Sequence, residues 1–362
     1  MGQAHYTEAL GRAGAAALDA LRGLEAAQRR LHPPDLPGLR ERLAPLAERL
    51  ESAREALVAA PVPAGLEPFH EQLLAGVASA DAALRSFARS DDPVHGVARV
   101  LDAMRLHCRA QEALYPLRQV LPPLGRHFAE TTWHARLEAL DPEPPSGTSV
   151  GVHAAGEPEG RGGFHLYVPE RYDARAPHPL VVALHGGFGH GRDFLWTWLR
   201  EARSRGFLLL APTSRGTTWS LQLPDVDAPA LCSMIDTVCE GWRVDRARIL
   251  LVGLSDGGTY ALLAGIGGAV PCAAMACVAG VLHPRLFAEP GGLARAAGRR
   301  VMIVHGALDW MFPVALARAA RDALAQAGAE VAYREIADLS HTWPREENAR
   351  ILAWFDAGLG SP

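Results

Sequence analysis

Lysine is absent from this sequence of 362 residues, so arginine supplies all 36 of its basic side chains. A Walker A phosphate loop, a pyridoxal-phosphate Schiff base and a Ser–Lys dyad each require a lysine side chain. The sequence therefore excludes these three kinds of chemistry. Asparagine is almost as rare, since Asn348 is the only one.

The net charge is also small, and cysteines are few. The formal net charge is only −4 and no basic run stands out, so we expect neither nucleic acid nor an anionic membrane surface as a partner. The five cysteines show neither Cys-x-x-Cys nor metal-ligand spacing, which predicts reduced, buried thiols in a cytoplasmic protein. Residues 1–20 contain Glu8 and Asp19 and no continuous apolar run, so we expect neither a signal peptide nor integral membrane association.

The first part of the chain has the composition of packed helices. Residues 1–140 are rich in Ala, Leu, Arg and Glu and are interrupted only at proline-containing turns, which predicts four long helices. Apolar residues recur at helical spacing, as in Leu66, Phe69, Leu73 and Val77. We therefore expect an all-α helical bundle domain that controls substrate access or forms a homo-oligomer, because no paired carboxylates or histidines suggest a site inside it.

The loop at 141–147, Asp-Pro-Glu-Pro-Pro-Ser-Gly, separates this region from a second domain over 141–362. From there short apolar runs alternate with helical stretches, and several runs are unbroken, as in strands covered on both faces. The expected strands occupy residues 164–168, 180–184, 207–211, 249–252, 273–278, 301–304 and 331–335. This pattern predicts an α/β domain with a mostly parallel sheet flanked by helices, and with any ligand outside the carboxyl ends of the strands.

One of these strands runs into the pentapeptide Gly-Leu-Ser-Asp-Gly at 253–257. A serine on a sharp turn between a strand and a helix adopts a strained backbone geometry that only small neighbours tolerate, which gives the two glycines a steric reason. The turn is expected to hold the hydroxyl of Ser255 clear of the sheet, where it can act as a nucleophile.

Candidate partners of Ser255 follow it in the sequence, as the acid and then the histidine do in this kind of site. Of the three later histidines, His341 alone follows a well-placed acid. Asp309 ends the strand at 301–304, whereas Asp338 is close to His341 in sequence and is the less suitable alternative. We predict a triad in which the imidazole of His341 takes the serine proton and the carboxylate of Asp309 fixes its tautomer.

The negative charge of a tetrahedral intermediate requires hydrogen-bond donors near the serine. The segment 184–190, Leu-His-Gly-Gly-Phe-Gly-His, follows an apolar strand at the position where one such donor belongs. We therefore predict an oxyanion hole made of the backbone N–H groups of Gly187 and Asp256, with Phe188 as an alternative to Gly187.

With these elements in this order, residues 160–358 resemble an α/β-hydrolase of the phospholipase/carboxylesterase and dienelactone-hydrolase type. The resemblance rests on His-Gly-Gly at 185–187, Gly-Leu-Ser-Asp-Gly-Gly at 253–258, Gly-x-x-Asp-x-x-x-Pro at 306–313 and Ser-His at 340–341. It implies the α/β-hydrolase fold and a serine hydrolase of carboxylic esters, thioesters or related acyl compounds, without metal or organic cofactor. The added N-terminal helical domain departs from the small members of the family and leaves substrate size open.

Tryptophans are frequent near the loops expected around the site, at positions 196, 198, 219, 310 and 343. A substrate pocket for an apolar or aromatic acyl group, lined by Phe188, Trp219 and Trp310, is one explanation. Simple packing at the top of the sheet is the other.

The leading hypothesis is a serine esterase that acts on small-molecule esters with short to medium or aromatic acyl groups. Because the same triad cleaves amides and thioesters, an acyl-peptide hydrolase, a peptidase or a thioesterase is an alternative. An alternative of another class is a helical scaffold or partner-binding protein with an inactive hydrolase-like domain, and the complete set of triad residues argues against it.

Overall fold

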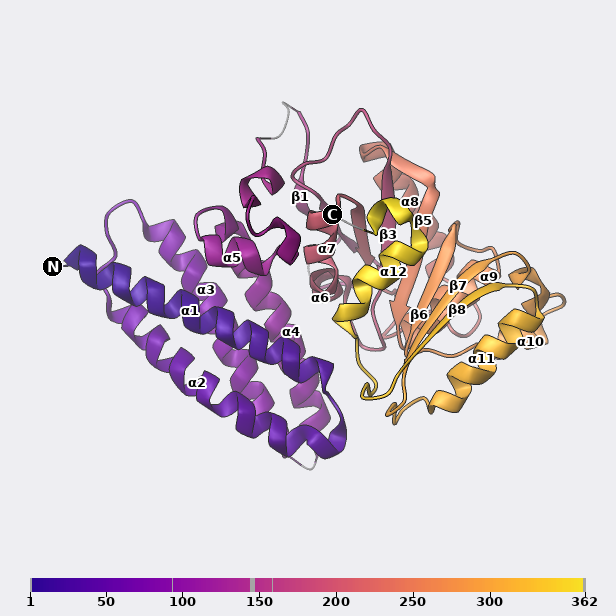
Figure 1. Ribbon diagram of the computed structural model, residues 1–362, viewed down its shortest axis with the longest axis horizontal. Helices are drawn as coiled ribbons and strands as arrows, with labels where there is room; N and C mark the ends of the chain where they lie inside the picture. Colours follow the sequence, from indigo (N-terminus) through magenta and orange to yellow (C-terminus); the bar gives the residue numbers. More distant parts are fainter. Residues whose placement is uncertain (1, 93, 144–146, 158, 361–362) are drawn as a thin grey trace. The chain divides into compact units, whose positions relative to one another are not determined.

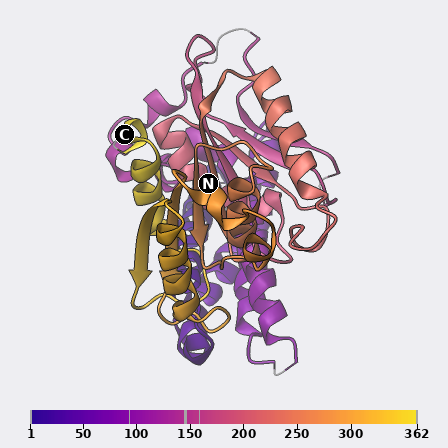
Figure 2. The ribbon, with the colours of Figure 1, turned by 90° about the vertical axis from the view of Figure 1, so that its right-hand side faces the viewer.

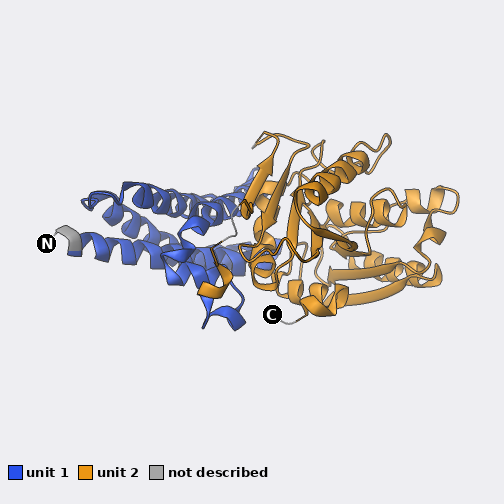
Figure 3. Ribbon diagram, turned by 90° about the horizontal axis from the view of Figure 1, so that it is seen from above, with its two compact units in different colours: residues 1–137 blue, residues 138–362 orange. Residues whose placement is uncertain are grey.

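The computed structural model describes residues 2–92, 94–143, 147–157 and 159–360. It divides into two compact units, Met1–Leu137 and Glu138–Pro362 (Figure 3). Residues 144–146 of the loop expected at 141–147 lie outside the described residues.

The first unit is a helical bundle, as predicted. Its long helices are α1 (Gly2–Arg29), α2 (Leu36–Ala59), α3 (Glu67–Ala88) and α4 (Gly96–Leu114), and the short helix α5 (Pro122–His127) follows them (Figure 1). Helix α1 packs against α2 and α3, and α3 packs against α4. The leucines of α2 that recur at helical spacing are buried at positions 39, 43, 50 and 57, which shows that the apolar stripe faces the inside of the bundle.

The described residues of the second unit form an eight-stranded sheet in the order β1-β2-β4-β3-β5-β6-β7-β8. The strands are β1 (Gly151–Ala155), β2 (Phe164–Val168), β3 (His178–Leu184), β4 (Leu208–Pro212), β5 (Val244–Leu254), β6 (Ala274–Val278), β7 (Arg300–Gly306) and β8 (Glu330–Ile336). Strand β2 is antiparallel to β1 and β4, and the other neighbouring strands are parallel. This order and direction are those of the α/β-hydrolase fold.

The expected strands are confirmed, and β1 is an additional one. Strand β1, Gly-Val-His-Ala-Ala, pairs only with β2 at the edge of the sheet and none of its residues is fully buried. Because an edge strand of this kind needs no unbroken apolar run, its sequence carries little strand signal.

Helices cover both faces of the sheet, as the turned view of Figure 2 shows. Apolar residues of α8 (Asp227–Gly241), α9 (Asp256–Ile266) and α11 (Val314–Gln326) share one core cluster with strand residues. Helix α7 (Leu199–Arg205) contacts β2 and β4, and Asn348 at the start of α12 (Asn348–Phe355) donates hydrogen bonds to Thr197 O and Glu201 Oε2. The short helices α6 (Gly191–Phe194) and α10 (Arg285–Ala288) belong to loops that follow strands.

The six parallel strands from β3 to β8 end at the same edge of the sheet. The loops after β3, β5, β7 and β8 carry Gly187, Ser255, Asp309 and His341, respectively. Parallel pairing therefore gathers these residues, which are up to about 150 positions apart in sequence, at one edge. Among the described helices, none has both the length and the apolar character that crossing a membrane requires.

Candidate active site

Ser255 occupies a strained turn between β5 and α9. Its backbone angles are φ 55° and ψ −120°, a conformation that costs free energy for any residue with a side chain. Two backbone hydrogen bonds hold the turn, from Ser255 N–H to Val278 O at 2.8 Å and from Thr259 N–H to Ser255 O at 2.9 Å. The surrounding sheet and helix therefore impose a geometry that directs the hydroxyl outward.

The glycines beside Ser255 are required by close backbone contacts. A Cβ atom on Gly253 would lie 2.3 Å from the carbonyl carbon of Gly257, and one on Gly257 would lie 2.4 Å from the backbone oxygen of His185. Both distances are too short for carbon, and the neighbouring atoms belong to the backbone and cannot move aside cheaply. The steric reason expected for these two glycines is confirmed.

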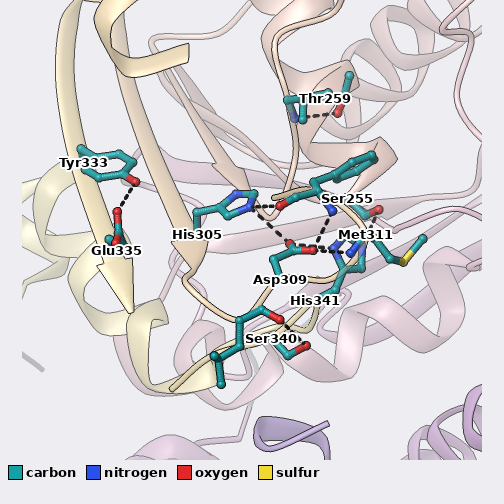
Figure 4. A network of polar contacts seen from close by, with 12 residues as sticks. Ser255, Thr259, His305, Asp309, Met311, Tyr333, Glu335, Ser340 and His341 are labelled. Atoms are coloured by element: carbon teal, nitrogen blue, oxygen red, sulfur yellow. Dashed lines mark hydrogen bonds and ion pairs between the residues drawn. The ribbon is translucent and has the colours of Figure 1, made fainter. Parts of the chain in front are cut away.

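The side chains of Ser255, His341 and Asp309 form a continuous polar chain (Figure 4). His341 Nε2 lies 2.9 Å from Ser255 Oγ, and His341 Nδ1 lies 2.8 Å from Asp309 Oδ2. A carboxylate accepts hydrogen bonds, so Nδ1 carries the hydrogen and Nε2 presents its lone pair to the serine hydroxyl. The carboxylate in contact with His341 is that of Asp309, and its role as the triad acid stays a prediction.

The carboxylate of Asp309 is held from its own loop. Its Oδ1 accepts hydrogen bonds from the backbone N–H groups of Met311, at 3.0 Å, and Phe312, at 2.8 Å. Asp309 is also buried. Donors on Oδ1 leave Oδ2 to face His341, so the loop determines which oxygen meets the imidazole.

Close packing brings the loops of Asp309 and His341 together. Leu308 N–H donates to Leu339 O at 2.9 Å, and the Ser340 hydroxyl donates to Leu308 O at 3.2 Å. A Cβ on Gly306 would lie 2.2 Å from Leu339 O, so only glycine allows this approach. The Gly-x-x-Asp and Ser-His motifs are therefore parts of one packed pair of loops.

The loop after β3 runs beside Ser255. A Cβ on Gly186 would lie 3.6 Å from Ser255 Cβ, and one on Gly187 would lie 2.8 Å from Asp256 Oδ2. Among the described residues, no hydrogen bond engages the N–H of Gly187, and the N–H of Asp256, in the first turn of α9, has no acceptor within its helix. Phe188 N–H donates to Thr217 O at 2.8 Å, so Phe188 is already engaged and Gly187 is the better placed of the two alternatives.

His185 holds this loop through both ring nitrogens. Its Nε2 accepts a hydrogen bond from Ser214 N–H at 3.1 Å, so Nδ1 carries the hydrogen that donates to Gly186 O at 2.7 Å. Burial lowers the pKa of His185 to about 3, which keeps the ring neutral. The sequence analysis assigned no role to His185. The only feature of the sequence that could have marked this residue is its place directly before Gly186 and Gly187.

Trp219 does not line an open pocket, contrary to the sequence-based prediction. Only 2% of its surface is exposed, and its ring stacks on Tyr260 with centroids 5.5 Å apart and an interplanar angle of 14°. Its Nε1–H donates to His185 O at 2.8 Å. The large apolar ring is buried because it packs beneath the loop after β3, so Trp219 supports that loop from below.

Packing also accounts for most of the other tryptophans. Trp196, Trp198 and Trp343 are buried, whereas Trp310, next to Asp309, is 52% exposed. Phe188 is 70% exposed. The two remaining predicted pocket residues, Phe188 and Trp310, thus present apolar side chains at the edge of the sheet that carries Ser255.

Sequence reasoning missed several apolar residues exposed on loops at the same edge. These are Leu223, after β4, Phe287, after β6, and Met311, after β7. Single apolar residues in loops carry no periodic pattern, so no sequence signal marked them. Among the described residues, no group of three or more His, Cys, Asp or Glu side chains is arranged to hold a metal ion.

No protein-family model matches the chain, and no curated protein matches it in sequence. Solved structures with a similar arrangement include a thermostable esterase, at 22% identity and a TM-score of 0.46, over 56% of this chain and 61% of that protein. The chain therefore spans less than two thirds of that esterase. An acetyl xylan esterase from Aspergillus awamori is similar at 14% identity and a TM-score of 0.44, over 56% of this chain and 98% of the esterase. SOBER1 from Arabidopsis thaliana is similar at 17% identity and a TM-score of 0.39, over 50% of this chain and 99% of SOBER1.

Proposed function

We propose that this protein is a serine hydrolase of carboxylic esters, with Ser255, His341 and Asp309 as its catalytic triad. The observation that carries the proposal is the polar chain from Ser255 Oγ to His341 Nε2, at 2.9 Å, and from His341 Nδ1 to Asp309 Oδ2, at 2.8 Å. These distances are those at which a proton passes between nucleophile and base. The strained turn at Ser255 supports the same assignment.

In the first half of the reaction His341 Nε2 takes the proton of the serine hydroxyl while Oγ forms a bond to the carbonyl carbon of the ester. The carbonyl oxygen becomes an oxyanion, which the N–H groups of Gly187 and Asp256 stabilise. His341 then returns its proton to the alcohol oxygen as the bond between carbon and that oxygen breaks. The products are a free alcohol and an acyl group on Ser255.

In the second half water replaces the alcohol. His341 takes a proton from water, whose oxygen attacks the acyl carbon, and Ser255 leaves with that proton as the acid is released. The N–H groups of Met311 and Phe312 hold Asp309 through its Oδ1, and its Oδ2 stabilises the transient imidazolium. These steps require no cofactor.

The surface around Ser255 favours a small, uncharged ester with an apolar or aromatic acyl group of short to medium length. Phe188 and Trp310 supply exposed aromatic surface for such a group. The carboxylate of Asp256 lies against the loop at Gly187, where its charge repels an anionic substrate.

A labelling experiment tests this function. The intact protein is treated with a fluorophosphonate probe and assayed with p-nitrophenyl esters graded by chain length, beside a p-nitroanilide that reports amide cleavage. We expect stoichiometric labelling at Ser255 and ester turnover, both lost in Ser255→Ala because the nucleophile is gone. Ser233→Ala, on the exposed side of α8, is the matched control that retains both. An unlabelled and inactive wild-type protein would instead indicate an inactive hydrolase-like domain.

A further inference from the structure

His305 is a buried imidazole beside the proposed triad to which the proposed mechanism gives no role. It lies on β7 and its exposed fraction is 0%. Its Nε2 is 2.8 Å from Phe312 O and 3.3 Å from Asp309 Oδ2 (Figure 4). Because Oδ2 also contacts His341 Nδ1, two imidazoles meet on one oxygen of Asp309.

The hydrogen-bond partners determine the tautomer of His305. A backbone carbonyl can only accept, so Nε2 carries the hydrogen that it donates to Phe312 O. In the described part of the chain Nδ1 is buried without a hydrogen-bond partner. An unpaired buried nitrogen is destabilising, and an apolar side chain of similar size would avoid it. Packing alone therefore does not explain a histidine at this position, whereas the contacts of Nε2 do.

His305 contacts the first and the last residue of the turn from Asp309 to Phe312, which carries the proposed acid. Asp309 Oδ1 closes the turn from inside by accepting the N–H groups of Met311 and Phe312. His305 Nε2 reaches the same turn from β7, at the Phe312 carbonyl and at Asp309 Oδ2. The Phe312 ring in turn packs edge-on against His341, with ring centroids 5.4 Å apart and an angle of 78°. One side chain on a rigid strand thus constrains both the carboxylate and the ring that flank the proposed base.

We propose that His305 is a positioning residue: its Nε2–H donates to Phe312 O and its ring lies against Asp309 Oδ2, so that His341 Nε2 is directed at Ser255. The inference rests on the proposed function, because it assigns His305 a role in the work of that triad. Among the described residues, no hydrogen bond or ion pair joins His305 to Ser255, and its exposed fraction is 0%, so it contacts the acid and offers no surface to substrate. Its effect is therefore on the rate of the chemical step and not on substrate binding.

The first test compares two substitutions of His305 in the full-length protein. His305→Leu removes the donor, and we expect kcat to fall about 10- to 100-fold, because a displacement of about 1 Å costs on the order of 10²-fold. KM should stay within about twofold, since binding energy common to the ground and transition states is untouched. His305→Gln keeps an N–H near the position of Nε2, and it should restore most of kcat.

A matched control separates positioning from the general cost of replacing a buried imidazole. His165 is a buried histidine on β2 of the same sheet. His165→Leu should leave kcat near the wild-type value with p-nitrophenyl esters. If His165→Leu lowered kcat as much as His305→Leu does, the effect at His305 would not be specific and the inference would be wrong.

A double-mutant cycle asks whether His305 acts through Asp309. In an Asp309→Asn background there is no carboxylate left to hold, so His305→Leu should lower kcat by a much smaller factor than it does alone. Equal factors in the two backgrounds would assign His305 a structural role only and overturn the inference. Wild-type kcat in His305→Leu would do the same.

Should His305→Leu fail to fold, a comparison of His305→Gln with His305→Asn decides the question. The shorter amide of asparagine cannot place an N–H where Nε2 lies, so the asparagine variant should have the lower kcat at similar KM. Equal kcat in the two variants would contradict the inference. Fluorophosphonate labelling of wild-type Ser255 tests the proposed function independently. A wild type that is neither labelled nor active would overturn both proposals. A labelled wild type whose His305 variants keep the wild-type kcat would overturn only the positioning role of His305.

Discussion

The buried imidazole of His185 should make the second unit sensitive to acid. Burial lowers its pKa to about 3 in the folded protein, whereas an exposed histidine in the unfolded chain has a pKa near 6.5. Between these two pH values the imidazole of His185 is protonated in the unfolded chain and neutral in the folded protein. This contribution to stability is therefore complete above about pH 6.5 and is lost as the pH falls toward 3.

The size of the effect follows from the two pKa values. The interval from the unfolded pKa near 6.5 down to pH 4 spans about 2.5 pH units, and each unit lowers the free energy of unfolding by about 1.4 kcal/mol. His185 alone should therefore lower the free energy of unfolding by about 3 kcal/mol at pH 4. The contact of Nε2 with Ser214 cannot persist when the ring takes a second proton, because a protonated Nε2 no longer accepts the Ser214 N–H. The loop that carries Gly187 should loosen as the imidazole is protonated.

Urea unfolding at pH 7 and pH 4, followed by tryptophan fluorescence, measures this loss. Trp133 is the one tryptophan within 1–137, so the signal reports almost entirely on the second unit. The asparagine of His185→Asn keeps a donor for Gly186 O but cannot be protonated. Between the two pH values the free energy of unfolding of this variant should fall by about 3 kcal/mol less than that of the wild type. His95→Asn, which replaces an exposed imidazole in the other unit, is the control and should match the wild type in this signal. Equal pH dependence of wild type and His185→Asn would refute the reasoning.

Four further predictions concern the proposed site and the bundle. Asp309→Asn should lower kcat by about 10⁴-fold, because the imidazole is then left in the wrong tautomer. A larger loss of kcat in Asp338→Asn would show that Asp309 is not the acid of the triad. Gly187→Ala should lower kcat by on the order of 10²-fold, because its Cβ would lie 2.8 Å from Asp256 Oδ2; wild-type kcat would argue against a donor there. Asp256→Asn should raise kcat/KM for an anionic ester relative to its neutral analogue, and an unchanged ratio would show that this charge does not reach the substrate. Deletion of residues 1–137 should change KM, chain-length preference or oligomeric state while Ser255 still reacts with a fluorophosphonate; identical behaviour would show that the bundle serves none of these.

Local chemistry was sufficient for the second unit's strands from β2 to β8 and for the turn at Ser255. Unbroken apolar runs predict buried strands because both faces are covered, and the glycines at 253 and 257 predict a sharp turn because no side chain fits there. The order of serine, acid and histidine along the chain then selected Asp309 and His341 from few candidates. The strands and the turn depend on residues and their immediate neighbours, and the choice of acid and histidine depends on their order along the chain, so the sequence by itself was enough to predict them.

Tertiary structure alone decided which loops touch and which side chains they bury. Trp219 is a large ring in a loop near the site, and only the packing of that loop over Tyr260 shows that it belongs to the core. His305 is one of the two histidines after Ser255 that do not follow a well-placed acid in the sequence, and its contact with Asp309 arises because the loop after β7 folds back over its own strand. Such contacts depend on how each loop folds and packs, whether the two residues are far apart in the chain, as Trp219 and Tyr260 are, or only four positions apart, as His305 and Asp309 are. Strand order and close loop packing set the distances in these contacts, and no local pattern of residues records them.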